Sequence, residues 1–194
     1  MIQERMTNVA TSQSKEINHL DSQHKRWFAV YTKYKCEKYV SELLNKKEVN
    51  TYLPLQTKLR RYTRKIKKLQ IPLINNYVFV QIKSSEYITV LETEYIYRFV
   101  RQGKNLISIP ENEIDILKRI VGDIESMEVL DVHSVAVGEE VEVISGQLTG
   151  LRGKIVSKWG KKKFVVELKN IGYLFHVQMD LAMLRPLREM KVTA

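Results

Sequence analysis

A chain of 194 residues can hold one ordinary domain or two small ones, and its 44% hydrophobic content is that of a globular protein. No apolar run reaches the roughly 20 residues that a membrane span needs, and the first residues lack the apolar segment of a signal peptide. The single Cys36 excludes an internal disulfide, and the four histidines have no metal-ligand spacing. We therefore expect a cytoplasmic protein without a cofactor or a metal.

The net charge of +10 is concentrated in one segment, residues 58–68, which we call the basic run. It contains seven cations and no acid, and the rest of the chain carries only +3. The seven are Lys58, Arg60, Arg61, Arg64, Lys65, Lys67 and Lys68. A local patch of this kind indicates contact with a polyanion. The alternative is a solvated hairpin that only aids solubility.

The first element expected to be ordered is a strand. Residues 1–24 are polar and non-periodic, which predicts a disordered leader. Residues 25–124 are expected to form the first domain, which opens with a buried strand at WFAVYT, starting at Trp27. A helix follows, and its apolar stripe consists of Cys36, Val40, Leu43 and Leu44.

The middle of this domain reads as β-structure. A strand over TYLPLQ leads into the basic run, whose cations alternate with apolar residues as in a projecting hairpin. The sequence YVFVQI, from Tyr77 to Ile82, predicts a core strand, and shorter β segments are expected at 97–100 and 106–109. The pattern predicts an α/β sandwich with a mainly antiparallel sheet, and an α+β class for the whole chain.

A helix is expected to close the first domain. Pro110 opens it, and its apolar side predicts that Ile114, Leu117, Val121 and Ile124 are buried. The segment 125–136 is acidic and weakly patterned, which predicts a flexible linker. Residues 137–189 are expected to form a second domain.

Closely spaced glycines define the second domain. The sequence VGEEVEVISGQLTGLRGKI contains two alternating runs with Gly146, Gly150 and Gly153 between them. Alternation is typical of half-buried strands, and glycines at this spacing mark tight turns or close backbone approaches. The pattern predicts a small, sharply bent β-barrel.

Both domains resemble those of NusG-type transcription elongation factors. VGEEVEVISGQLTGLRGKIV is similar to the KOW motif, and the second domain through NIGYLFHVQMDLAML resembles the SH3-like KOW barrel of that family. WFAVYT, Glu37 with Lys38, and PLINNYVFV resemble the NusG N-terminal domain. Asn75-Asn76 replaces the family's Pro-Gly, and asparagine tolerates the left-handed conformation. The departures and the basic run make the chain most similar to specialised paralogues of the RfaH and UpxY type, the latter found with capsular polysaccharide operons.

The resemblance implies a non-enzymatic, monomeric factor that binds the clamp helices of the largest RNA polymerase subunit and suppresses pausing or termination. It implies polymerase-binding residues Leu73, Ile74 and Tyr77, for which core packing is the alternative. It implies contact of the basic run, including Tyr62, with the non-template DNA strand or nascent RNA. It also implies contact of Leu148 and Leu151 in the KOW domain with ribosomal protein S10 or Rho.

Three other functions stay open. One is a general housekeeping NusG-like factor, and another is a KOW-type RNA-binding protein of the ribosome or its assembly. The third is a nucleic-acid enzyme, but the sequence offers no clustered acids or metal site to support it.

Overall fold

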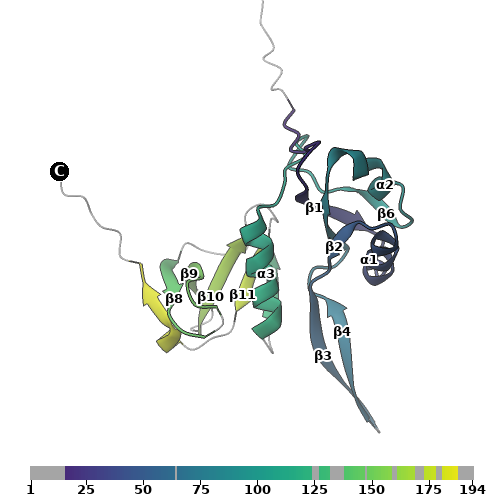
Figure 1. Cartoon of the computed structure of the whole chain (residues 1–194). Helices are drawn as coiled ribbons and strands as arrows, with labels where there is room; N and C mark the ends of the chain where they lie inside the picture. Colours follow the sequence, from purple (N-terminus) through teal and green to yellow (C-terminus); the bar gives the residue numbers. More distant parts are fainter. Residues whose placement is uncertain are drawn as a thin grey trace, which may run out of the picture.

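The computed structural model describes residues 16–63, 65–123, 127–131, 138–146, 148–158, 161–168, 173–177 and 181–187. Figure 1 shows an N-terminal sheet with its helices, a hairpin that projects from it, and a C-terminal sheet, with α3 between the two sheets. No helix of the described residues is long and apolar enough to cross a membrane.

The N-terminal sheet has four antiparallel strands in the order β2-β5-β1-β6. The strands are β1 (Arg26–Thr32), β2 (Asn50–Tyr52), β5 (Tyr77–Ile82) and β6 (Ile96–Phe99). The β-branched and aromatic composition of β1 and β5 suits central strands that are buried on both faces. The prediction of a mixed α/β fold with an antiparallel sheet is confirmed.

Each face of this sheet packs on helices. Phe28, Val30, Val78 and Val80 point to the face covered by α1 (Glu37–Lys46), whose Val40 and Leu44 are buried in the same cluster, with Val90 of α2 (Tyr87–Leu91). The alternate residues Trp27, Ala29 and Phe79 belong to a second cluster with α3 (Glu111–Asp123). The buried residues of α3 are Ile114, Leu117 and Ile120. Val121 is only half-buried, and Ile124 lies outside the described residues.

Residues 16–24 are ordered, although we expected them to belong to a disordered leader. Ile17 and His19 exchange backbone hydrogen bonds with Leu106, and the imidazole of His19 accepts one from the backbone N–H of Ser108 at 3.1 Å. The backbone carbonyl of Asp21 accepts one from the N–H of Ser84, at the start of the short 3₁₀ helix Ser84–Glu86. Polar composition suggested disorder here, but these partners are distant in the sequence. Residues 1–15 lie outside the described part of the chain.

The basic run forms a two-stranded antiparallel hairpin, as predicted. Its strands are β3 (Leu55–Tyr62) and β4 (Lys65–Pro72), which pair in register from Leu55↔Pro72 to Tyr62↔Lys65. The hairpin projects well beyond the sheet from which it emerges (Figure 1).

The C-terminal part is a six-stranded antiparallel sheet in the order β12-β8-β9-β10-β11-β7. Its strands are β7 (Met127–Asp131), β8 (Glu139–Val143), β9 (Arg152–Lys158), β10 (Lys161–Leu168), β11 (Tyr173–Val177) and β12 (Leu184–Pro186), with the 3₁₀ helix Leu181–Met183 before β12. β7 lies within the stretch that we expected to be a linker, where it pairs with β11.

The glycines have the two roles that their spacing predicted. Gly146 and Gly150 have φ of 83° and 82°, so they form turns in the left-handed region. Gly153 marks a close approach, because a Cβ there would lie 2.5 Å from the carbonyl oxygen of Val165 and 2.7 Å from the Phe164 ring.

Candidate functional site

The hairpin has two faces of different chemistry. Directly paired residues of an antiparallel ribbon share a face, and residues two apart along a strand share it too. The pairs Leu59↔Lys68 and Arg61↔Ile66 therefore form one face, which we call the aliphatic face. The opposite face, the cationic face, carries Lys58, Arg60, Lys65 and Lys67, with the half-buried Leu69 directly across from Lys58.

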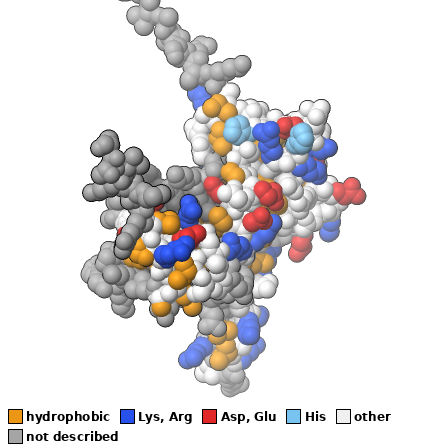
Figure 2. All heavy atoms as spheres, turned by 60° about the vertical axis from the view of Figure 1, so that its left-hand side comes forward, with side chains coloured by type: hydrophobic (Ala, Val, Ile, Leu, Met, Phe, Trp, Pro, Cys, Tyr) orange, Lys and Arg blue, Asp and Glu red, His pale blue; other side chains and the backbone are white. Residues whose placement is uncertain are grey.

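All of these side chains are exposed. Leu59 and Ile66 are 64% and 61% exposed, and they are diagonal neighbours across the two strands. In Figure 2 the projecting part at the bottom carries blue cationic and orange hydrophobic side chains together. The side chain of Tyr62 and the placement of Arg64 lie outside the described part of the chain. The structure thus brings six of the seven cations together on a thin ribbon that is open to solvent.

The turn before β5 is held by a buried carboxylate. Asn76 has φ of 65°, as expected for an asparagine in place of glycine. Its backbone N–H donates to Glu37 Oε1 at 2.8 Å, and its side chain amide donates to the carbonyl oxygen of Thr32 at 3.2 Å. Its own carbonyl oxygen accepts from the N–H of Thr32 at 2.8 Å. β1 and α1 therefore jointly fix where Tyr77 begins its strand.

Leu73 and Ile74 lie beneath the surface. They are 5% and 2% exposed and belong to the cluster that contains α3. Tyr77 is half-buried, and its ring stands edge-on to that of Tyr31, with centroids 5.7 Å apart. Of the three residues singled out in this segment, Tyr77 is therefore the one that reaches solvent.

Two residues that we did not single out extend the surface around Tyr77. The ring of Tyr97 is 60% exposed and lies 6.4 Å from that of Tyr31, and the guanidinium of Arg98 lies 5.8 Å from the Tyr31 ring centroid. We call Tyr31, Tyr77, Tyr97 and Arg98 the tyrosine surface. Arg98 pairs with Tyr31 and Ile96 with Thr32, so the register shift at Tyr31/Thr32 leaves Tyr97 without a paired residue, and both Tyr97 and Arg98 lie against the Tyr31 ring. A pairing irregularity leaves no signal in the sequence.

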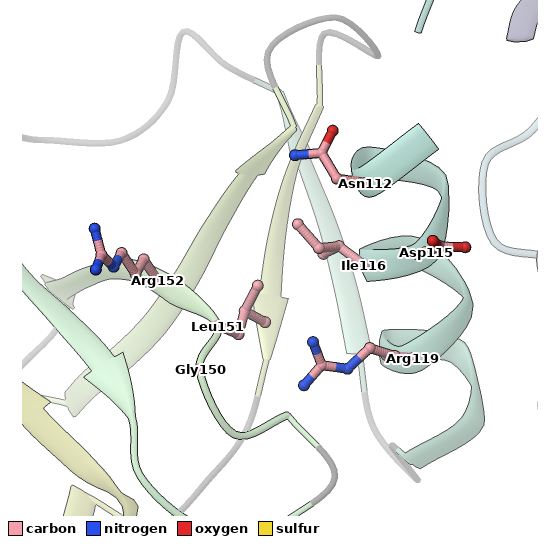
Figure 3. A pocket seen from close by; sticks show the side chains of 7 residues that line it. All are labelled: Asn112, Asp115, Ile116, Arg119, Gly150, Leu151 and Arg152. Carbon is pink, nitrogen blue, oxygen red and sulfur yellow. The ribbon is translucent and has the colours of Figure 1, made fainter. Parts of the chain in front are cut away.

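Leu148 and Leu151 are also buried, at 3% and 4% exposure, in the cluster that contains α3. The guanidinium of Arg119 donates to the carbonyl oxygen of Thr149 at 2.8 Å. Next to this contact lies a hollow of about 430 Å³, bounded by α3 and by Gly150, Leu151 and Arg152. In Figure 3, Ile116 and Arg119 point from α3 toward Leu151. In this arrangement, α3 is packed on both sheets.

Electrostatics link α3 to the N-terminal sheet. The indole N–H of Trp27 donates to Glu111 Oε2 at 2.7 Å, and Lys118 Nζ lies 5.9 Å from the ring centroids of both Trp27 and Tyr52. Burial raises the pKa of Tyr52, so this phenol stays neutral at all physiological pH values. These contacts give α3 a fixed orientation on the sheet.

Comparison with known proteins places the N-terminal part. Residues 25–118 match the family model "Transcription termination factor nusG". A structure described as "Domain interaction in Thermotoga maritima NusG" is 20% identical and has a TM-score of 0.55; the alignment covers 86% of this chain and 99% of that one. A structure of the "MjSpt4:Spt5 complex conformation A" is 17% identical, with a TM-score of 0.29, and covers 83% of this chain and 97% of that one. No curated protein matches the chain. Residues 25–118 are therefore similar to the NusG domain, and the Thermotoga protein shares the fold.

Proposed function

We propose that this chain is a non-enzymatic transcription elongation factor of the NusG type that acts in the cytoplasm by binding RNA polymerase. The observation that carries the proposal is the match of residues 25–118 to the NusG family model. The four-stranded sheet with its buried-carboxylate turn gives that region a rigid surface on which to bind a partner.

The tyrosine surface is the proposed contact with the clamp helices of the largest polymerase subunit. Tyrosine rings give a large contact area at little cost in rotamer entropy, and Arg98 adds a charge that suits an acidic helix. Leu73 and Ile74 support this surface from below, since both are buried. Tyr77 remains the central residue of the proposed contact.

The hairpin is the proposed nucleic-acid contact, with the non-template DNA strand or nascent RNA as its ligand. Six exposed cations in the described part of the run support this proposal. Each phosphate contact with a single strand contributes about −0.7 to the slope of log K against log salt, so all seven contacts together would give roughly −5.

The C-terminal sheet is proposed to be a KOW-type domain that recruits a second factor, ribosomal protein S10 or Rho. Leu148 and Leu151 are its proposed contact residues. Because both pack in the cluster that contains α3, a partner that binds them competes with that packing. We further propose that the factor is operon-specific and suppresses termination, for example at capsular polysaccharide genes.

An elongation assay tests this proposal. Purified protein is added to halted elongation complexes, and the lifetimes of defined pauses are measured after nucleotides are restored. We expect shorter pauses and more read-through at a terminator. Unchanged pausing, together with co-sedimentation of the protein with ribosomal subunits in the absence of transcription, would favour the ribosomal alternative instead.

A further inference from the structure

We propose that residues 16–24, which we call the strap, control how firmly α3 is held and, through α3, the access of a partner to the C-terminal sheet. The strap precedes the region that matches the NusG family model, which begins at residue 25. The inference rests on the proposed recruitment of a second factor by Leu148 and Leu151, and it adds a means of regulating that contact.

The strap holds the segment through which the chain reaches α3. Both backbone groups of Leu106 bond to it: the N–H donates to the carbonyl oxygen of Ile17, and the carbonyl oxygen accepts from the N–H of His19, each at 2.9 Å. The N–H of Ser108 donates to His19 Nδ1 at 3.1 Å. The side-chain oxygen of Asn105 accepts from the N–H of Ile17 at 2.8 Å. These bonds fix the approach to α3 from one side.

This approach crosses from one hydrophobic core to the other. Leu106 is 2% exposed and belongs to the cluster on the α1 and α2 face of the sheet, whereas Ile109 belongs to the cluster that contains α3. The backbone N–H of Ile109 donates to the carbonyl oxygen of Trp27, whose indole N–H bonds to Glu111 at the start of α3. A shift at Leu106 therefore reaches the first turn of α3 through only a few residues.

The strap itself is held mainly by hydrogen bonds near the surface. Ile17 is 49% exposed, and His19 and Leu20 are half-buried. The side chain of Leu20 packs against the cluster on the α1 and α2 face. An element with few buried apolar contacts opens at a lower free energy than the core of its domain. The strap can therefore be released while the N-terminal sheet stays folded.

Release of the strap has its effect on the other side of α3. Leu148 and Leu151 are buried in the cluster that contains α3. The guanidinium of Arg119 donates from α3 to the carbonyl oxygen of Thr149. The hollow of about 430 Å³ beside this contact leaves the two surfaces incompletely packed, so they separate more easily than a close-packed core. A less firmly held α3 exposes Leu148 and Leu151 more often, and the partner binds the exposed state.

The test uses the full chain with Cys36→Ser and one reporter cysteine, whose rate of labelling by a thiol reagent is measured. Leu151→Cys reports separation of the C-terminal sheet from α3. Val165→Cys, at a buried position outside the cluster that contains α3, reports unfolding of the sheet. Hydrogen exchange at the backbone N–H groups of Leu106 and Ser108 reports docking of the strap.

The strap variant is His19→Ala with Leu20→Ser, which removes the acceptor for the N–H of Ser108 and the apolar contact. Its matched control is Ser22→Ala with Gln23→Ala, two exposed side chains of the same segment. His19→Asn keeps an acceptor oxygen close to the position of Nδ1 and is the conservative variant.

We expect the strap variant to exchange faster at Leu106 and Ser108 and to label Leu151→Cys about 10-fold faster, a typical size for coupling between two sites. The matched control and His19→Asn keep the wild-type rates, and labelling at Val165→Cys is unchanged in all of them. The inference is overturned if the strap is undocked but Leu151→Cys labels at the wild-type rate, or if labelling at Val165→Cys rises equally. Unprotected exchange at Leu106 in the wild type overturns it as well.

These readouts need neither polymerase nor a second factor, so the inference and the proposed function fail separately. Strap-dependent labelling in a protein that has no effect on elongation leaves the inference standing and removes the proposed function. Shorter pauses produced by a protein whose labelling does not depend on the strap do the reverse.

Discussion

The carboxylate of Glu37, at the start of α1, accepts a hydrogen bond from the backbone N–H of Asn76 at 2.8 Å. Glu37 is only 3% exposed, and its buried side chain holds one turn of the chain. That turn has a left-handed residue at Asn76 and leads directly to Tyr77. The geometry of the tyrosine surface therefore depends on a helix that makes no part of that surface.

Glu37→Ala is expected to lower the free energy of unfolding by about 1–3 kcal/mol, because the N–H of the half-buried Asn76 is left without its acceptor. Glu37→Gln keeps an acceptor oxygen at the same reach and should lose clearly less. Urea unfolding followed by circular dichroism measures both. If alanine and glutamine variants unfold at the same midpoint, the hydrogen bond does not hold the turn.

Gly153→Ala should destabilise the C-terminal sheet by about 1–3 kcal/mol or more, since the new methyl group meets the backbone of β10 at Val165 and the ring of Phe164. The backbone oxygen cannot move without disturbing the β9–β10 pairing. Lys154→Ala, an exposed neighbour in β9, is the control and should stay within about 0.5 kcal/mol. The measurement is the melting temperature of each variant. If Gly153→Ala melts at the same temperature as Lys154→Ala, the close approach at Gly153 does not constrain the sheet.

The ordered segment 16–24 should depend on pH through Asp21. Hydrogen bonds from the backbone N–H groups of His24 and Gln23, with a smaller contribution from the charge of Arg26, lower the pKa of Asp21 to about 2. This pKa is below the value of about 3.9 that Asp21 has in the unfolded chain, so the ionised carboxylate stabilises the folded state. This stabilisation is complete at pH values above about 4, and it is lost as the pH falls from about 4 toward 2.

The measurement is the melting temperature of wild type and Asp21→Asn between pH 6 and pH 2. The variant should melt lower than the wild type at pH 6, and the difference should shrink as the pH approaches 2. A difference that stays constant across this range would mean that the ionised carboxylate of Asp21 does not stabilise the segment.

The elements that could be predicted from the sequence are those with a strong local pattern of apolar and polar residues. β5 runs from Tyr77 to Ile82 as expected, and the hairpin follows from alternation within the basic run. α2 was missed because Tyr87–Leu91 spans little more than one turn, reads YITVL, and is too short to show a helical period. Contacts between distant segments were also invisible, which is why residues 16–24 were expected to be disordered.

The candidate site was predictable only in part. The exposure of the cations follows from their charge, whereas Ile74 and Leu148 are apolar residues next to turns, where sequence cannot tell a contact residue from a core residue. Packing against α3 decides both cases. Ile74→Asp would bury a charge and destabilise the domain, so this variant would not report on binding alone.

The central claim is that the tyrosine surface binds RNA polymerase, and co-purification with core polymerase tests it most directly. The test variant is Tyr97→Ala with Arg98→Glu, which changes an exposed edge strand, and the control is Ile88→Ser with Lys46→Gln on the opposite side of the sheet. We predict that wild type and control retain polymerase equally and that the test variant, folded by circular dichroism, loses at least 10-fold in affinity. Undiminished retention of polymerase by the folded test variant would contradict the account.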